Sequence, residues 1–191
     1  RAAGLAEMNM LRMNIGIEHG NYEYRRNYLK RNVKDEVQIK AFEIAAEHEY
    51  ASCANSIIGM PDETRDLIFD TINFVRKLPD NIDATGAFIF APYHGTPLRD
   101  LAIKKGYIRD DEICSLSNTS ESMLRMPTIS KNEIQGLAKV FSLYTKFPEN
   151  RWPEIKIAEK DDTEGTKMME KLGKEFDSTY RQFASATDLH D

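Results

Sequence analysis

Cysteine is scarce in this sequence, and other markers of specialised environments are missing. Among its 191 residues there are two cysteines, Cys53 and Cys114, which are too few for a disulfide framework and too far apart for a metal knuckle. A reducing, cytoplasmic location is therefore expected. No apolar run approaches the roughly 18 residues of a membrane span, and we expect neither a membrane segment nor a secretory signal. The net charge of −5 comes without a basic block, so nothing indicates a nucleic-acid partner.

Motifs that define several large enzyme classes are also absent. The sequence has no Gly-x-Gly-x-x-Gly, no Gly-Lys-Ser phosphate loop and no Gly-x-Ser-x-Gly elbow. Classical dinucleotide-binding, kinase and serine-hydrolase functions therefore have no support. The chain does have an ordinary globular balance of 41% hydrophobic and 30% charged residues, so it can form a core.

Strands and helices are expected to alternate over the first half of the chain. Short apolar runs predict strands at 13–17, 53–59 and 84–91, and helical apolar spacing predicts helices at 22–49, 61–78 and 96–105. This order and spacing are typical of right-handed βαβ units in a parallel sheet. The strands are almost continuously apolar, which predicts that both faces of the sheet are covered.

The second half is expected to be mostly helical. Residues 109–127 are polar and predict a long loop, after which Ser130 and Glu133 form a capping box that starts a helix. A short connector at 148–153 and a final helix at 163–183 complete the pattern. We therefore divide the chain into an α/β part at 1–107 and an α-helical extension at 108–191.

Three polar turns follow the expected strands, where parallel α/β folds bind their ligands. The first carries Glu18, whose carboxylate can accept hydrogen bonds from a ribose diol, and Gly20, which lets a ligand approach the backbone. The second contains Gly59, and the third carries Tyr93 and His94 at its tip. Taken singly, each is better explained as an ordinary turn: a solvated carboxylate, a capped strand-to-helix junction and a proline–glycine turn. No metal site is predicted, because His94 has no second ligand at helical spacing.

Taken in order, the three turns resemble those of radical S-adenosylmethionine enzymes. The segment at 14–20 is similar to the family's fourth-strand motif, often I-G-[IV]-E-S-G, and the segment at 57–64 to its fifth-strand motif, often I-I-G-[LM]-P-G-E-T. The segment at 88–97 is similar to the sixth-strand motif, often F-x-P-Y-P-G-T-P-L. The resemblance is nearest to the group that often carries an N-terminal cobalamin-binding domain. It covers residues 1–107, and the remainder resembles that group's helical C-terminal extension.

The resemblance implies an α/β fold that holds the last three βα units of a partial, TIM-like barrel. In the family, a glutamate at the position of Glu18 lies near the ribose of S-adenosylmethionine, and the fifth-strand residues lie by the adenine. The end of the sixth strand also borders the nucleoside. The cofactor-binding residues implied in this way are Glu18, Gly20, Ile57, Gly59, Ala91, Pro92 and Tyr93. His19 and His94 are the candidates for the substrate side.

Two substitutions and one missing loop separate this chain from the family pattern. His19 stands where serine is usual, and Asp62 stands where glycine is usual, although aspartate tolerates a left-handed turn better than most residues. The Cys-x-x-x-Cys-x-x-Cys loop that holds a [4Fe–4S] cluster is not in this sequence, and Cys53 and Cys114 cannot replace it. We therefore expect a fragment, inactive alone, of an enzyme that cleaves S-adenosylmethionine to a 5′-deoxyadenosyl radical. Its first partner would be the missing N-terminal half of its own chain.

Two other interpretations stay open. The chain can be a cluster-free α/β domain that binds a nucleoside, or a non-catalytic scaffold. The sequence indicates neither the substrate, small or macromolecular, nor the reaction, and cobalamin is implied only as a cofactor that the full-length protein can carry. Because three strands cannot close a barrel, an unpaired edge predicts that the isolated chain is sticky or oligomeric.

Overall fold

A parallel sheet of three strands forms the centre of the molecule. The computed structural model describes residues 12–48, 51–79, 86–114 and 121–180, together with Gly4 and Ile82. The strands are β1 (Arg12–Glu18), β2 (Ala51–Ile58) and β3 (Ala87–Ile89), and they lie in this order in the sheet. Both neighbouring pairs are parallel. The predicted α/β fold with three successive parallel strands is therefore confirmed.

Helices connect the strands. They are α2 (Tyr22–Asn27), α3 (Asp35–Glu47), α4 (Arg65–Val75) and α5 (Pro97–Lys104). The hydroxyl oxygens of Thr64 and Thr96 accept hydrogen bonds from backbone amides in the first turns of α4 and α5, so both helices begin at a side-chain cap. The cap predicted at Thr96, with Pro97 in the first turn, is confirmed.

The single helix predicted at 22–49 is wrong, because α2 and α3 are separate helices. The buried guanidinium of Arg25 donates a hydrogen bond of 3.1 Å to the carbonyl oxygen of Val33 and another to the carboxylate of Asp35. These bonds hold the intervening loop against α2. Within that loop Lys30 has a φ of +54°, which no right-handed helix contains. The spacing of apolar residues cannot predict such a contact between a buried side chain and a loop.

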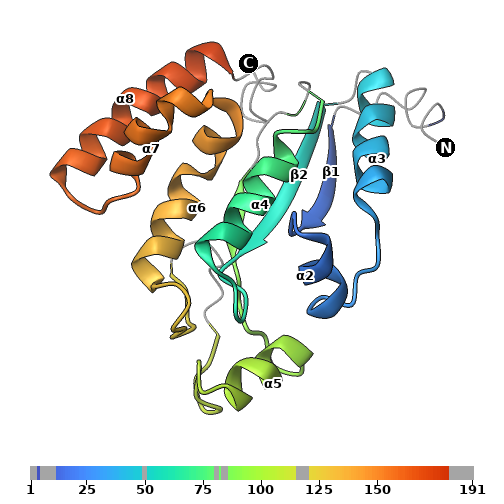
Figure 1. Cartoon of the computed structure of the whole chain (residues 1–191), viewed down its shortest axis with the longest axis vertical. Coiled ribbons are helices and arrows are strands. Elements are labelled where there is room, and N and C mark those ends of the chain that lie inside the picture. The colour runs from blue at the N-terminus through green and yellow to red at the C-terminus, as the bar shows by residue number, and fades with distance from the viewer. Residues whose placement is uncertain are drawn as a thin grey trace, which may run out of the picture.

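The two faces of the sheet are covered unequally. In β2 the side chains of Ser52, Ala54, Ser56 and Ile58 are buried, while Cys53, Asn55 and Ile57 on the other face are only partly buried. Helix α4 lies across the covered face, flanked by α3 and α6 (Figure 1). The prediction that both faces of the sheet are covered therefore holds for one face, whereas the other face is only partly covered among the described residues and remains open to a ligand.

The second half of the chain packs beside the sheet as helices. They are α6 (Lys131–Lys146), a short 3-10 helix η1 (Glu149–Arg151), α7 (Trp152–Ala158) and α8 (Thr163–Thr179). The capping box between Ser130 and Glu133 is confirmed. The connector predicted between Pro148 and Pro153 is itself helical, because Pro153 occupies the first turn of α7, where its missing amide costs no hydrogen bond.

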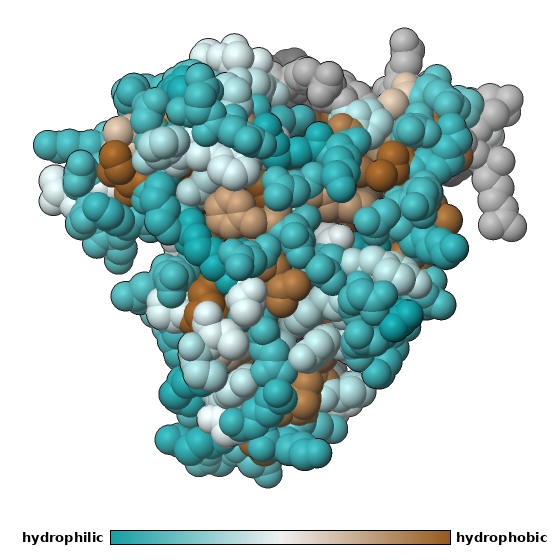
Figure 2. All heavy atoms as spheres, viewed as in Figure 1, coloured by the Kyte–Doolittle hydropathy of each residue, from teal (hydrophilic) through white to brown (hydrophobic). Residues whose placement is uncertain are grey.

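Contacts between α6 and both β3 and α4 join this helical part to the sheet, so its division from the α/β part at residue 107 stays a prediction. Hydrophilic side chains predominate over α7 and α8 on the face shown in Figure 2. None of the helices in the described ranges is long and apolar enough to cross a membrane.

Candidate functional site

A pocket of about 730 Å³ opens beside the carboxyl ends of the three strands. Four of the residues predicted from the sequence line it: Glu18, Ile57, Ala91 and Tyr93. The sheet also contributes Gly16, Asn55, Phe88, Ile89 and Phe90, the loop after α2 contributes Tyr28, Leu29 and Lys30, and the start of α5 contributes Thr96, Pro97 and Leu98. Its volume falls in the range of small-molecule sites, which is roughly 300–1,000 Å³.

Glu18 is held in an unusual backbone conformation at the edge of this pocket. Its φ is +64°, and the β1–β2 register shifts between Gly16 and Glu18, as at a bulge. The carboxylate lies over Gly16, since a methyl group there would come 2.5 Å from Oε1. Arg31 fixes this arrangement by donating to Oε1 at 3.1 Å and to the carbonyl oxygen of Gly16 at 2.7 Å. Among the described residues no hydrogen bond reaches Oε2, so that oxygen remains available to a ligand.

An apolar wall faces this carboxylate. Ile57 and Phe88 are paired in register on neighbouring strands, so their side chains lie on the same face of the sheet. Phe88 is 40% exposed and Tyr93 is 46% exposed, and both line the pocket with aromatic surface. A flat, partly exposed apolar surface next to a carboxylate suits a ligand with an aromatic ring at one end and hydroxyl groups at the other.

The turn after β3 places its two polar rings differently. Pro92 is buried, and its carbonyl oxygen accepts a hydrogen bond of 3.0 Å from Arg99. Gly95 has a φ of +77°, which lets the chain reverse before Thr96 caps α5. Tyr93 lines the pocket, whereas His94 is exposed and does not line it.

The two glycines expected to admit a ligand are packed against helices instead. A methyl group at Gly20 would come 2.4 Å from the backbone of Asp70 in α4, and the Gly20 amide donates to Oγ1 of Thr71 at 2.9 Å. Gly59, with a φ of +78°, faces Ile134 of α6. Neither lines the strand-end pocket, so their role in this structure is close packing and turn geometry.

His19, a candidate for the substrate side, is fully buried and does not line the pocket. Its Nδ1 accepts a hydrogen bond of 2.9 Å from the amide of Asn21. Its Nε2 lies 3.0 Å from Oε1 of Glu63, which is also fully buried. The pair is not aligned as a straight hydrogen bond, and among the described residues neither atom has another partner. The ring of His19 also stacks on Tyr24, with centroids 4.3 Å apart.

Asp62 adopts the left-handed conformation expected at its position, with a φ of +64°. Its carboxylate accepts hydrogen bonds from Tyr28 at 2.9 Å and Tyr107 at 2.6 Å, and Lys105 lies 2.6 Å away. Partial burial alone would raise the pKa of Asp62, but these three donors outweigh it and hold the pKa below its usual value. Because Tyr28 lines the pocket, Asp62 supports one of its walls from behind.

Sequence reasoning missed several residues of the site, notably Arg31, Asn55 and Phe88. Asn55 and Phe88 could have been identified from the sequence, because side chains two positions apart on a strand lie on the same face. Asn55, for example, stands two positions before Ile57. Arg31 carried none, because its approach to Glu18 depends on the loop that separates α2 from α3.

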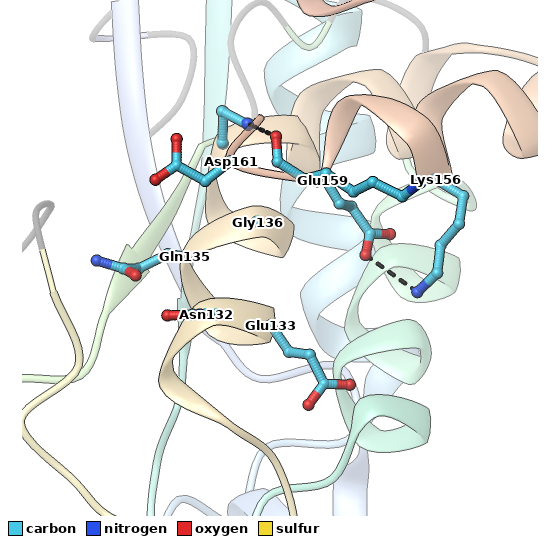
Figure 3. Close-up of a pocket in the computed structure, with 9 residues that line it drawn as sticks. Asn132, Glu133, Gln135, Gly136, Lys156, Glu159 and Asp161 are labelled. Atoms are coloured by element: carbon cyan, nitrogen blue, oxygen red, sulfur yellow. Dashed lines mark hydrogen bonds and ion pairs between the residues drawn. The ribbon is translucent and has the colours of Figure 1, made fainter. Parts of the chain in front are cut away.

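A second pocket of about 570 Å³ lies between α6 and α7 (Figure 3). Charged side chains at its edge include Lys139, Lys156 and Glu159. Lys139 donates to the carbonyl oxygen of Lys160, and Lys156 is paired with Glu159. Two of its charged side chains, Lys156 and Glu159, therefore bind each other, and the pocket includes none of the residues at the strand ends.

Neither a protein-family model nor a curated protein sequence matches this chain. Within the described residues, no group of three or more histidine, cysteine, aspartate or glutamate side chains is arranged to hold a metal ion. The strand-end pocket, by contrast, offers a carboxylate and an apolar wall.

Proposed function

We propose that this chain forms part of the nucleoside-binding wall of a radical S-adenosylmethionine enzyme. The observation that carries the proposal is that Glu18, Ile57, Ala91 and Tyr93, from three different strand ends, line one pocket. These are positions at which the sequence motifs resemble those of the family. The successive parallel strands are compatible with the last three βα units of its partial barrel.

In this proposal the residues of the pocket bind and orient the nucleoside of S-adenosylmethionine. Glu18 accepts hydrogen bonds from the ribose hydroxyls through its available oxygen, and Ile57 and Phe88 pack against the adenine. Tyr93 and Leu98 cover the edge of the ring and exclude water. The cluster, held by another part of the intact enzyme, would supply the electron for cleavage of S-adenosylmethionine.

Nucleoside binding by this chain tests the pocket directly. Adenosine, 2′-deoxyadenosine and 3′-deoxyadenosine are titrated into ¹⁵N-labelled protein, and the affinities are taken from amide chemical shifts. Each deoxy analogue loses a hydrogen bond to a charged group, so we expect about tenfold weaker binding than for adenosine. Glu18→Gln should remove most of this preference. Glu23→Gln, on the exposed side of α2, is the matched control and should keep it. Equal binding of all three nucleosides by the unchanged protein would refute the site.

The wider assignment needs the intact parent protein. After anaerobic reconstitution it should contain iron and sulfide, show cluster absorbance and release 5′-deoxyadenosine when S-adenosylmethionine and a reductant are added. Absence of a cluster from the correctly folded parent contradicts the radical-enzyme assignment and leaves the nucleoside site standing.

A cluster-free nucleoside-binding domain is the second candidate, and it is favoured by the fact that this chain alone forms the pocket described above. The two candidates differ in affinity. A wall that lacks the rest of its barrel should bind adenosine only in the millimolar range, whereas a complete binding domain should bind it in the micromolar range or below.

A further inference from the structure

His19 and Glu63 connect the turn after β1 with the turn after β2. His19 directly follows β1, and Glu63 lies five residues after the end of β2, just before the N-cap of α4. Each side chain is fully buried, and Nε2 of His19 lies 3.0 Å from Oε1 of Glu63. Burying two ionisable groups is costly unless they are paired, so this contact requires a reason in the structure around it.

The hydrogen bond to the imidazole indicates the tautomer of its neutral form. Because the amide of Asn21 donates to Nδ1, that nitrogen carries no proton. In the neutral ring the proton therefore sits on Nε2, the atom that faces Glu63. The carbonyl oxygen of His19 accepts a hydrogen bond of 2.6 Å from Arg25, which fixes the backbone at the same residue.

Glu63 uses its second oxygen to hold the other turn. Oε2 accepts hydrogen bonds from the amides of Gly59 and, at 3.1 Å, of Met60. One carboxylate thus faces the turn after β1 with one oxygen and binds the turn after β2 with the other. Glu18 immediately precedes His19, and Ile57 lies two residues before Gly59, so each turn continues into a residue that lines the pocket.

We propose that His19 and Glu63 form a positioning pair that sets the Glu18 carboxylate relative to the apolar wall of the pocket. The inference rests on the proposed nucleoside site. Neither side chain touches the pocket, so they act through the backbone turns. Disturbing the pair should therefore change how well the ribose hydroxyls are recognised more than how well the adenine is bound.

Two substitutions of His19 test the roles of its two ring nitrogens independently. His19→Gln keeps a donor near the position of Nε2, within reach of Glu63, whereas His19→Asn keeps only an acceptor near the position of Nδ1. We expect His19→Gln to keep the roughly tenfold preference for adenosine over 2′-deoxyadenosine, and His19→Asn to reduce it to about twofold or less. His48→Asn, at the carboxyl end of α3, is the matched control and should behave as the unchanged protein.

The same preference in His19→Asn and His19→Gln, measured on folded variants, would overturn the inference while the nucleoside site stands. If the unchanged protein shows no preference for adenosine over 2′-deoxyadenosine, both the positioning pair and the nucleoside site are refuted. If His19→Asn does not fold, the ¹⁵N shifts of the His19 ring in the unchanged protein decide instead. A proton fixed on Nε2 supports the pair, and a proton on Nδ1 overturns it.

Discussion

Replacing Glu159 with glutamine should loosen the attachment of the helical extension to the sheet. The Glu159 carboxylate, whose side chain is 8% exposed, accepts hydrogen bonds from Arg65 of α4 at 2.6 and 2.9 Å, from Tyr144 of α6 at 2.5 Å and from Lys156 of α7 at 3.1 Å. Three helices therefore meet at one carboxylate. The rings of Tyr144 and Trp152 pack edge to face beside it, with centroids 5.4 Å apart.

The size of the effect follows from these contacts. Hydrogen bonds to charged groups contribute about 1.5–3 kcal/mol each, and breaking a fully buried ion pair costs about 3–5 kcal/mol. Glutamine keeps one acceptor oxygen, and the Arg65 side chain is 26% exposed, so solvent replaces part of what is lost. We therefore expect Glu159→Gln to lower the free energy of unfolding by about 2–3 kcal/mol at neutral pH.

Urea unfolding followed by circular dichroism measures this loss, with Glu170→Gln on the exposed side of α8 as the control. The control should change stability by less than about 0.5 kcal/mol. A loss below about 1 kcal/mol for Glu159→Gln would refute the reasoning, because it would show that the carboxylate gains no more from its partners than from water.

The pH dependence supplies a second check. Burial tends to raise the pKa of Glu159, but the hydrogen bonds from Arg65 and Tyr144 outweigh it and lower the pKa. A folded-state pKa below the unfolded value means that the stabilisation is present above the unfolded pKa and is lost as the pH falls through the folded one. The stability difference between the unchanged protein and Glu159→Gln should be constant near neutral pH and shrink below about pH 4.

Three further predictions concern the turns and the sheet edge. Gly59→Ala should lower the free energy of unfolding by about 1–2 kcal/mol, because it puts a methyl group on a residue with positive φ, 3.0 Å from Ile134. Gly173→Ala in α8, where no atom lies within 4 Å of the added methyl group, is the control and should be neutral or stabilising in the same urea experiment. Asp62→Asn should lower the free energy of unfolding by about 1 kcal/mol, because it removes the charge that binds Lys105 and Tyr28. For the same reason it should weaken adenosine binding in the titration. On a sizing column the isolated chain should elute above its monomer mass, since β1 and β3 have no further strand partner among the described residues; a monodisperse monomer contradicts this.

Local signals in the sequence predicted most of the elements. The three strands, the caps at Thr96 and Ser130, and the positive φ expected at Asp62 depend on residues close together in the chain, and all are present. The position of Glu18, Ile57 and Tyr93 in one pocket also followed, because the carboxyl ends of parallel strands meet at one edge of a sheet.

Residues far apart in the chain decided the rest. Helix α2 ends early because Arg25 bonds to residues eight to ten positions away. Trp152, at the start of α7, packs against aromatic rings from α4 and α6. Gly59 packs on α6, and His19 turns inward to Glu63 instead of toward a substrate. These features depend on which buried groups form hydrogen bonds or packing contacts with residues of other elements.

The sequence by itself therefore determined the alternation of strands and helices and the edge of the sheet at which a ligand can bind. Local propensity, capping and apolar spacing act within a few residues, so they can be read from the chain alone. Only the tertiary structure decided which face of the sheet stays open, which oxygen of Glu18 is available, and that His19 is buried beside Glu63. Those features require groups from separate elements to satisfy one another's hydrogen bonds, and no local pattern encodes that.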